Sequence, residues 1–210
     1  MQRLQRILLA LAILVVPACG SGDIHLPAPL FSDQFNGGFP GNNWTVPATT
    51  GTAPTVQITG GVLSFTGAAM NSSATTTSTT AFTNPNLTIA LQLGVLASAG
   101  QNGVGTIEIL DATPTVVAVL TWDAGAASLT YTITGTSVSP GPPPPADGTL
   151  IGFRFNVDAM GTASWSINNA QIGTKAGFPA GPLKIRLGGA FGNSATWPEF
   201  RFDSISVTSP

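Results

Sequence analysis

The chain has 210 residues, and only 8% of them are charged, with 7 Lys and Arg against 9 Asp and Glu. This sparse, slightly acidic charge provides no concentrated basic surface, so we expect no nucleic-acid partner. A single cysteine excludes a disulfide within the chain, and together with a single histidine it excludes a zinc site of Cys and His ligands.

The N-terminus has the pattern of a secretory signal peptide. Two arginines precede an apolar run over residues 7–16, which is well short of the ~20 residues that span a bilayer. The letters V-P-A-C that end at Cys19 resemble the bacterial lipobox, whose cysteine is acylated and becomes the new N-terminus. We therefore predict a signal peptide over 1–18 and a tether over 19–29 with a lipid on Cys19. The protein is then an exported lipoprotein of the outer membrane or cell surface, in contact with the membrane through this anchor only; the alternative is cleavage after Ala18 and secretion.

From residue 30 onward, apolar residues recur with a period of two, as in strands with one buried face. The clearest runs are 87–95, 129–133 and 151–157. Residues 116–122 are apolar at both parities, which predicts a central strand buried on both faces. Tight-turn pairs at Gly60-Gly61 and Asn168-Asn169 separate further short strands. No amphipathic helix is predicted, so the fold class is all-β: a two-sheet antiparallel β-sandwich in one domain over 30–210.

Two segments have a biased composition. Residues 75–80 (TTTSTT) suit a polar edge strand, because threonine fits the pleat and discourages edge-to-edge aggregation. Residues 140–145 (PGPPPP) predict a stiff polyproline II connection between strands. Either segment offers a surface on which a partner protein can pack.

Three motifs resemble the concanavalin A-like lectin/glucanase superfamily. They are F-S-D-Q-F at 31–35 followed by Trp44, the hairpin V-Q-I-T-G-G-V-L-S-F at 56–65, and the closing F-R-F-D-S-I-S-V at 200–207. The resemblance implies a jelly roll whose first and last strands are adjacent. In the closing strand a β-bulge at Asp203-Ser204 would let apolar residues of both parities point inward.

The catalytic pattern of this superfamily is not present. Its hydrolytic members carry E-x-D-x-x-E or E-x-D-x-E on one concave strand, and glycoside hydrolysis with retention needs two carboxylates ~5 Å apart. The nearest match is Glu108-Ile109-Leu110-Asp111, whose spacing of three puts the two carboxylates on opposite faces of a strand. His25 lies in the tether, where it cannot complete a Ser-His-Asp triad. We therefore predict that the protein is not an enzyme, with a non-standard polysaccharide-degrading site as the alternative.

The resemblance also implies a structural calcium ion. Related glucanases hold it with an aspartate on the last strand and with backbone carbonyls near the chain start and in the first hairpin. Asp203 matches the aspartate, and Gly61 approximately matches the hairpin glycine. Mixed carboxylate and carbonyl oxygens are ligands that calcium accepts.

Candidate ligand-binding residues fall into two groups. Trp197 lies in the segment 192–198, where an exposed ring can stack on a sugar. Arg154, Asn156 and Asp158 share the outward parity of one predicted strand. The chain is expected to be a lectin-like domain that binds a glycan or cell-wall polysaccharide; the alternative is a surface structural protein that packs on a partner.

Overall fold

The computed structural model describes residues 28–83, 85–142 and 145–209. None of these residues is helical, and no helix among them is long and apolar enough to span a membrane. The predicted signal peptide, Cys19 and most of the tether lie outside the described residues, so their assignment stays a prediction.

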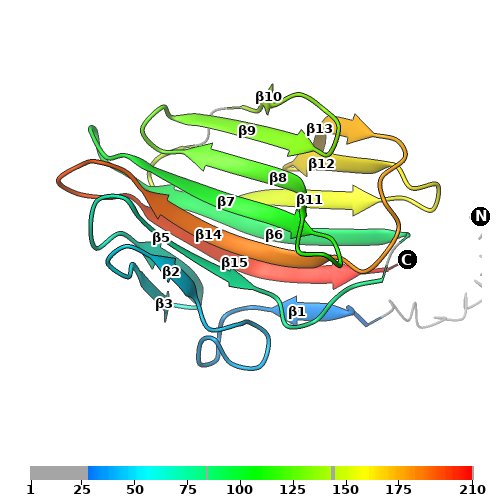
Figure 1. Cartoon of the computed structure of the whole chain (residues 1–210), viewed down its shortest axis with the longest axis horizontal. Helices are drawn as coiled ribbons and strands as arrows, with labels where there is room; N and C mark the ends of the chain where they lie inside the picture. The colour runs from blue at the N-terminus through cyan, green and yellow to red at the C-terminus, as the bar shows by residue number, and fades with distance from the viewer. Residues whose placement is uncertain (1–27, 84, 143–144, 210) are drawn as a thin grey trace, which may run out of the picture.

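Two antiparallel sheets pack face to face (Figure 1). The front sheet, which faces the viewer in Figure 1, has seven strands in the order β10-β9-β8-β7-β14-β5-β2. These strands span Ala48–Thr50 (β2), Ser72–Thr77 (β5), Gly103–Leu110 (β7), Val116–Asp123 (β8), Ser128–Ile133 (β9), Ser139–Pro140 (β10) and Lys184–Phe191 (β14). The back sheet has eight strands in the order β13-β12-β11-β6-β15-β4-β3, with β1 paired to β15. They span Phe31–Asp33 (β1), Thr55–Thr59 (β3), Val62–Thr66 (β4), Leu87–Leu96 (β6), Ile151–Val157 (β11), Ala163–Ile167 (β12), Ala170–Lys175 (β13) and Glu199–Thr208 (β15).

The predicted fold class and the strand periodicity are confirmed. Alternate residues of β6 and β11 are buried over most of their length, and the two strands pair from Leu87 to Leu93 and from Ile151 to Val157. Both predicted hairpins form, because their turn residues adopt the positive φ that tight turns require: 60° and 79° at Gly60 and Gly61, 47° and 67° at Asn168 and Asn169.

The core fills the space between the two sheets. Trp122 and Trp165 are 1% and 0% exposed, so both are core residues rather than ligand platforms. In β15 the register shifts between Asp203 and Ser206, and Ser204 has a φ of 52°. This irregularity is the predicted bulge, and it keeps apolar residues of both parities buried: Phe200, Phe202, Ile205 and Val207.

Aromatic side chains fasten the start of the chain to this core. The rings of Phe31 and Trp44 meet edge to face with their centroids 5.8 Å apart, and β1 pairs with the last strand, as the resemblance implied. The indole N–H of Trp44 donates to Asp33 Oδ2 at 2.9 Å, which satisfies the one polar group of a buried ring.

Two sequence predictions about strands were wrong. β8 is central but is not buried on both faces along its length: Leu120 is fully buried, whereas Val119 is half-buried and Val116 is 36% exposed. Val117 is buried beside the register shift opposite Leu110. The threonine-rich strand β5 is not an edge strand, because β2 pairs along its outer side.

Candidate functional site

The outward face of the front sheet is floored by hydroxyl-bearing side chains. The strand register places one row side by side across β9, β8, β7, β14 and β5: Thr130, Thr121, Thr106, Gly188 and Thr75. A Cβ at Gly188 would lie 2.9 Å from Thr106 Oγ1 and 3.0 Å from Thr75 Cγ2, so this glycine keeps the centre of the row shallow. The result is an uncharged strip of threonines that runs across the strands.

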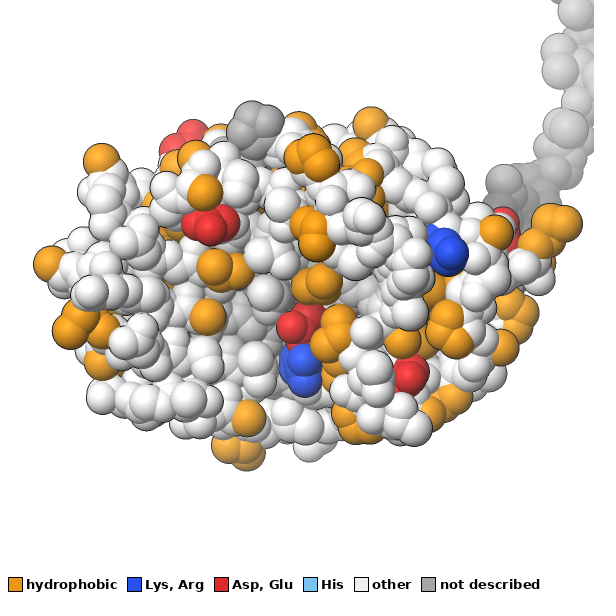
Figure 2. Space-filling view, turned by 45° about the horizontal axis from the view of Figure 1, so that its top comes forward, with side chains coloured by type: hydrophobic (Ala, Val, Ile, Leu, Met, Phe, Trp, Pro, Cys, Tyr) orange, Lys and Arg blue, Asp and Glu red, His pale blue; other side chains and the backbone are white. Residues whose placement is uncertain are grey.

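One ion pair lies in the next row of the same face. Glu108 and Arg186 are opposite each other on β7 and β14, and the Arg186 Nε–H donates to Glu108 Oε2. Their side chains are 17% and 29% exposed, so the pair is partly shielded by its neighbours. Figure 2 shows how few charged side chains this side of the molecule carries. Because the two charges offset each other, the face as a whole stays close to neutral.

A hollow of about 420 Å³ with both polar and apolar walls lies at one end of this face. Its polar groups are amides, hydroxyls and one carboxylate, supplied by Asn71, Ser72, Ser73, Asn102 and Asp123, and its apolar wall includes Val104 and Ala190. Asn102 Nδ2 donates to the backbone oxygen of Asn193 at 3.2 Å, which holds the β6–β7 and β14–β15 connections together beside the hollow. We call this space the front hollow.

The opposite end of the face has a different chemistry. A second space of about 350 Å³ there is lined mostly by apolar groups, among them Leu110, Pro114 and Pro182. Asp111 also borders it, but its carboxylate accepts the N–H groups of Thr113 and Thr115 at 2.8 and 2.9 Å. The hydrogen bond from the N–H of Thr115 contributes most to lowering the pKa of Asp111, and the bonds from Thr113 add to it.

The structure therefore changes the account of Glu108 and Asp111. The sequence analysis put them on opposite faces of one strand, but β7 ends at Leu110, and Asp111 lies in the turn that follows. Its carboxylate caps that turn, whereas Glu108 is held by Arg186 in the middle of the face.

The predicted ligand row lies in the back sheet, with two residues on β11 and the third just past its end. Arg154 is exposed, whereas Asn156 Oδ1 accepts a hydrogen bond from Thr88 Oγ1 at 2.8 Å. Asp158 follows the end of the strand, and its carboxylate accepts the N–H groups of Met160 and Thr162. Among the described residues, the side chain of Arg154, the Nδ2 of Asn156 and the Oδ2 of Asp158 form no hydrogen bond, so ligand binding by these three residues stays a prediction.

Trp197 lies in the connection between β14 and β15, apart from that row. Its indole N–H donates to the backbone oxygen of Gly192 at 3.0 Å, and its ring packs against the core. The ring also covers Gly67, where a Cβ would lie 2.6 Å from Trp197 Cγ. These contacts give the ring a packing role, and stacking on a sugar stays a prediction.

The bulge that contains Asp203 and the hairpin that contains Gly61 both approach the N-terminal segment. Asp203 Oδ1 accepts the N–H of Ser204 at 2.6 Å, and Ser204 Oγ donates to Gln34 Oε1 at 3.3 Å. A Cβ at Gly61 would lie 3.3 Å from Asn36 Oδ1 and 3.9 Å from the Gln34 backbone oxygen. These are oxygen donors, as calcium requires. However, no group of three or more His, Cys, Asp or Glu forms among the described residues, so backbone and amide oxygens would supply most ligands.

The sequence analysis did not predict the strip of threonines on the front sheet or the Glu108–Arg186 pair. Glu108 was examined only for a second carboxylate nearby, and its partner is 78 positions away along the chain. A sequence signal did exist, because threonines recur at every second position in β5 and β9, at Thr75 and Thr77 and at Thr130 and Thr132. What the sequence lacked was the strand order that joins these alternations into one surface.

No protein-family model matches this sequence, and no curated protein matches it. Solved structures match closely in shape. An O-glycanase structure from members of the human gut microbiota has a TM-score of 0.66 at 10% identity, over 87% of this chain and 99% of that one. The chain has the concanavalin A-like jelly-roll fold.

Two further matches show how broadly this jelly-roll fold is used. A Bacteroides ovatus GH16 protein, solved with a G4G4G3G product, has a TM-score of 0.62 at 14% identity, over 85% of this chain and 100% of its own. The Emp47p carbohydrate recognition domain has a TM-score of 0.61 at 14% identity, over 85% of this chain and 94% of its own. These likenesses confirm the predicted fold and the resemblance on which it was based.

The comparisons contradict the prediction that the protein is not an enzyme. That prediction rested on the absence of one pattern of acids on one strand, yet the solved structures that match this chain are mostly glycosidases and transglycosylases. At 10–16% identity a short pattern is a poor guide to chemistry, because the fold is retained after nearly all residues have changed. The missing acid pattern therefore does not exclude catalysis by this protein.

Proposed function

We propose that this protein binds a glycan chain across the outward face of its front sheet. The observation that carries the proposal is the front hollow, which joins amide, hydroxyl and carboxylate groups to a floor of threonines. Its volume of about 420 Å³ lies within the range of small-molecule sites. Sugar hydroxyls pair with such groups as both donors and acceptors of hydrogen bonds.

The charge of the face favours a neutral glycan. Glu108 and Arg186 pair with each other, so neither needs a charged ligand to balance it. Asp123 is the remaining acid at the front hollow, and its Oδ1 already accepts the N–H of Ala126 at 2.9 Å. Carbohydrate-binding and carbohydrate-cleaving proteins that share the jelly roll support the same class of ligand.

A glycan array followed by calorimetric titration of the strongest hit tests the proposal. Ala190→Tyr is the informative variant, because Ala190 is exposed on β14 and lines the front hollow, where an aromatic side chain fits the strand and fills the space. We expect this variant to bind at least tenfold more weakly, a loss of about 1.4 kcal/mol. The matched control is Ala170→Tyr, at an exposed position of β13 in the back sheet, which should bind as wild type does.

The outcomes separate the functions still open. Absence of binding to every glycan on the array would overturn the proposal and favour a surface protein that packs on a partner. Equal affinity of wild type and Ala190→Tyr would move the site away from the front hollow. Mass spectrometry of the bound glycan after incubation shows whether the chain is also cleaved, which binding alone does not reveal.

A further inference from the structure

A second polar hollow, of about 350 Å³, opens on the outward face of the back sheet, on the far side of the sandwich from the proposed glycan face. Its centre is Gly152, where a Cβ would meet only Asn168 Oδ1, at 3.6 Å. The missing side chain leaves a space walled by Gln92 on β6, Arg154 along β11, and the turn at Asn168. We call this space the back hollow.

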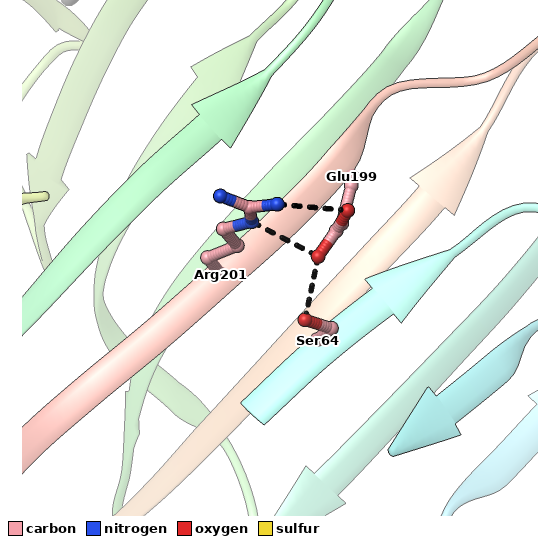
Figure 3. Close-up of polar contacts among 3 residues, drawn as sticks. All are labelled: Ser64, Glu199 and Arg201. Atoms are coloured by element: carbon pink, nitrogen blue, oxygen red, sulfur yellow. Dashed lines mark hydrogen bonds and ion pairs between the residues drawn. The ribbon is translucent and has the colours of Figure 1, made fainter. Parts of the chain in front are cut away.

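Arg154 brings an uncompensated positive charge to the back hollow. The two ion pairs among the described residues occupy Arg186 and Arg201. Figure 3 shows the second of these, in which Arg201 Nε and Nη2 donate to the two Glu199 oxygens at 2.9 and 3.2 Å. Arg154 forms no hydrogen bond or ion pair with any described residue, and its side chain is exposed at the hollow.

The other groups around the back hollow are neutral donors and acceptors. Asn168 Oδ1 accepts the N–H of Gly152 at 3.1 Å, which leaves its amide nitrogen free to donate. The side chains of Gln92 and Asn169 bond to no other described residue. The nearest acid in the strand register is Asp203, opposite Gln92 on β15, and it does not line the hollow.

We propose that the back hollow binds a sugar that carries a carboxylate, such as a hexuronate. A guanidinium pairs with a carboxylate through two parallel hydrogen bonds, and the amides around it match sugar hydroxyls. The volume lies at the lower end of ligand sites, which suits a single ring rather than a chain. This site is independent of the proposed front-face function, because the two faces share no residue.

Titration of the full chain with glucuronate, by calorimetry or ligand-observed NMR, tests the proposal. We expect Arg154→Gln to weaken glucuronate binding at least tenfold, about 1.4 kcal/mol. Gly152→Val should abolish binding by filling the space while suiting the strand. Lys175→Gln, which makes the same charge change on β13 away from the hollow, should bind within twofold of wild type.

Two further ligands define the chemistry. Glucose, which lacks the carboxylate, and inorganic sulfate, which lacks the hydroxyls, should each bind at least tenfold more weakly than glucuronate. Higher salt should weaken glucuronate binding, because the ion pair is accessible to solvent. Absence of glucuronate binding, equal binding by Arg154→Gln, or sulfate binding tighter than that of glucuronate would each overturn the proposal.

Discussion

Gly105→Ala should destabilise the protein through one contact between the two sheets. Gly105 lies on β7 and points at Phe200 on β15, and an added Cβ would come within 2.5, 2.9 and 3.0 Å of three atoms of that ring. Carbon atoms prefer separations of about 3.5–4.0 Å. The ring cannot swing away, because Phe200 is fully buried. Overpacking of this kind costs about 1–3 kcal/mol.

Urea unfolding followed by tryptophan fluorescence measures the loss. With a slope of about 2–3 kcal/mol per molar urea, the midpoint of the Gly105→Ala variant should fall by roughly 1 M. Gly152→Ala is the matched control, a strand glycine whose added Cβ would meet only Asn168 Oδ1, at an ordinary contact distance of 3.6 Å. Since glycine weakens a strand interior by about 0.5–1 kcal/mol relative to alanine, this control should be neutral or slightly stabilising.

A double mutant isolates the contact itself. Phe200→Leu makes room for the new methyl group, so the double variant should lose less stability than the two single changes added together, by about 0.5–3 kcal/mol. Additive losses, or a Gly105→Ala midpoint equal to that of wild type, would refute the close packing of Gly105 on Phe200.

Three other predictions concern charge, metal and anchor. Hydrogen bonds from Arg201 hold the pKa of Glu199 below its usual 4.5, against the opposing effect of burial and with help from Ser64. A carboxylate with a lowered pKa contributes stability at pH values above the pKa of the unfolded state, and this contribution is lost as the pH falls through the pKa of the folded state. The melting temperatures of wild type and Glu199→Gln should therefore differ at pH 7 and converge near pH 3. A difference that stays constant with pH would contradict this prediction. If calcium binds at Asp203, calcium at a hundredfold excess over Kd should raise the free energy of unfolding by about 2.7 kcal/mol in wild type and by little in Asp203→Asn. Identical melting temperatures of wild type in calcium and in EDTA would contradict the calcium site. Intact-mass measurement of protein from a bacterial host should show acyl groups on Cys19, and a mature N-terminus without them rejects the anchor.

Much of the fold could be predicted from local patterns. Period-two alternation located β6, β9 and β11, and the paired glycines and asparagines located two hairpins, because both signals depend on neighbouring residues only. The bulge in β15 was predictable as well, since only an extra residue can turn apolar side chains of both parities inward.

The binding surfaces depend on strand order, which local patterns do not contain. Glu108 meets Arg186 only because β14 inserts beside β7, and the threonine row crosses five strands that are scattered along the chain. The predicted row on β11 is shorter in the structure for a related reason: the strand ends before Asp158, whose Oδ1 accepts N–H groups of its own turn, and ligand binding by the row stays a prediction. Sequence alone determined an all-β chain, because periodicity is a local property, and the lipoprotein-like start that it also predicts stays a prediction. Tertiary structure decided which polar groups pair with each other and which, like Arg154, have no partner among the described residues.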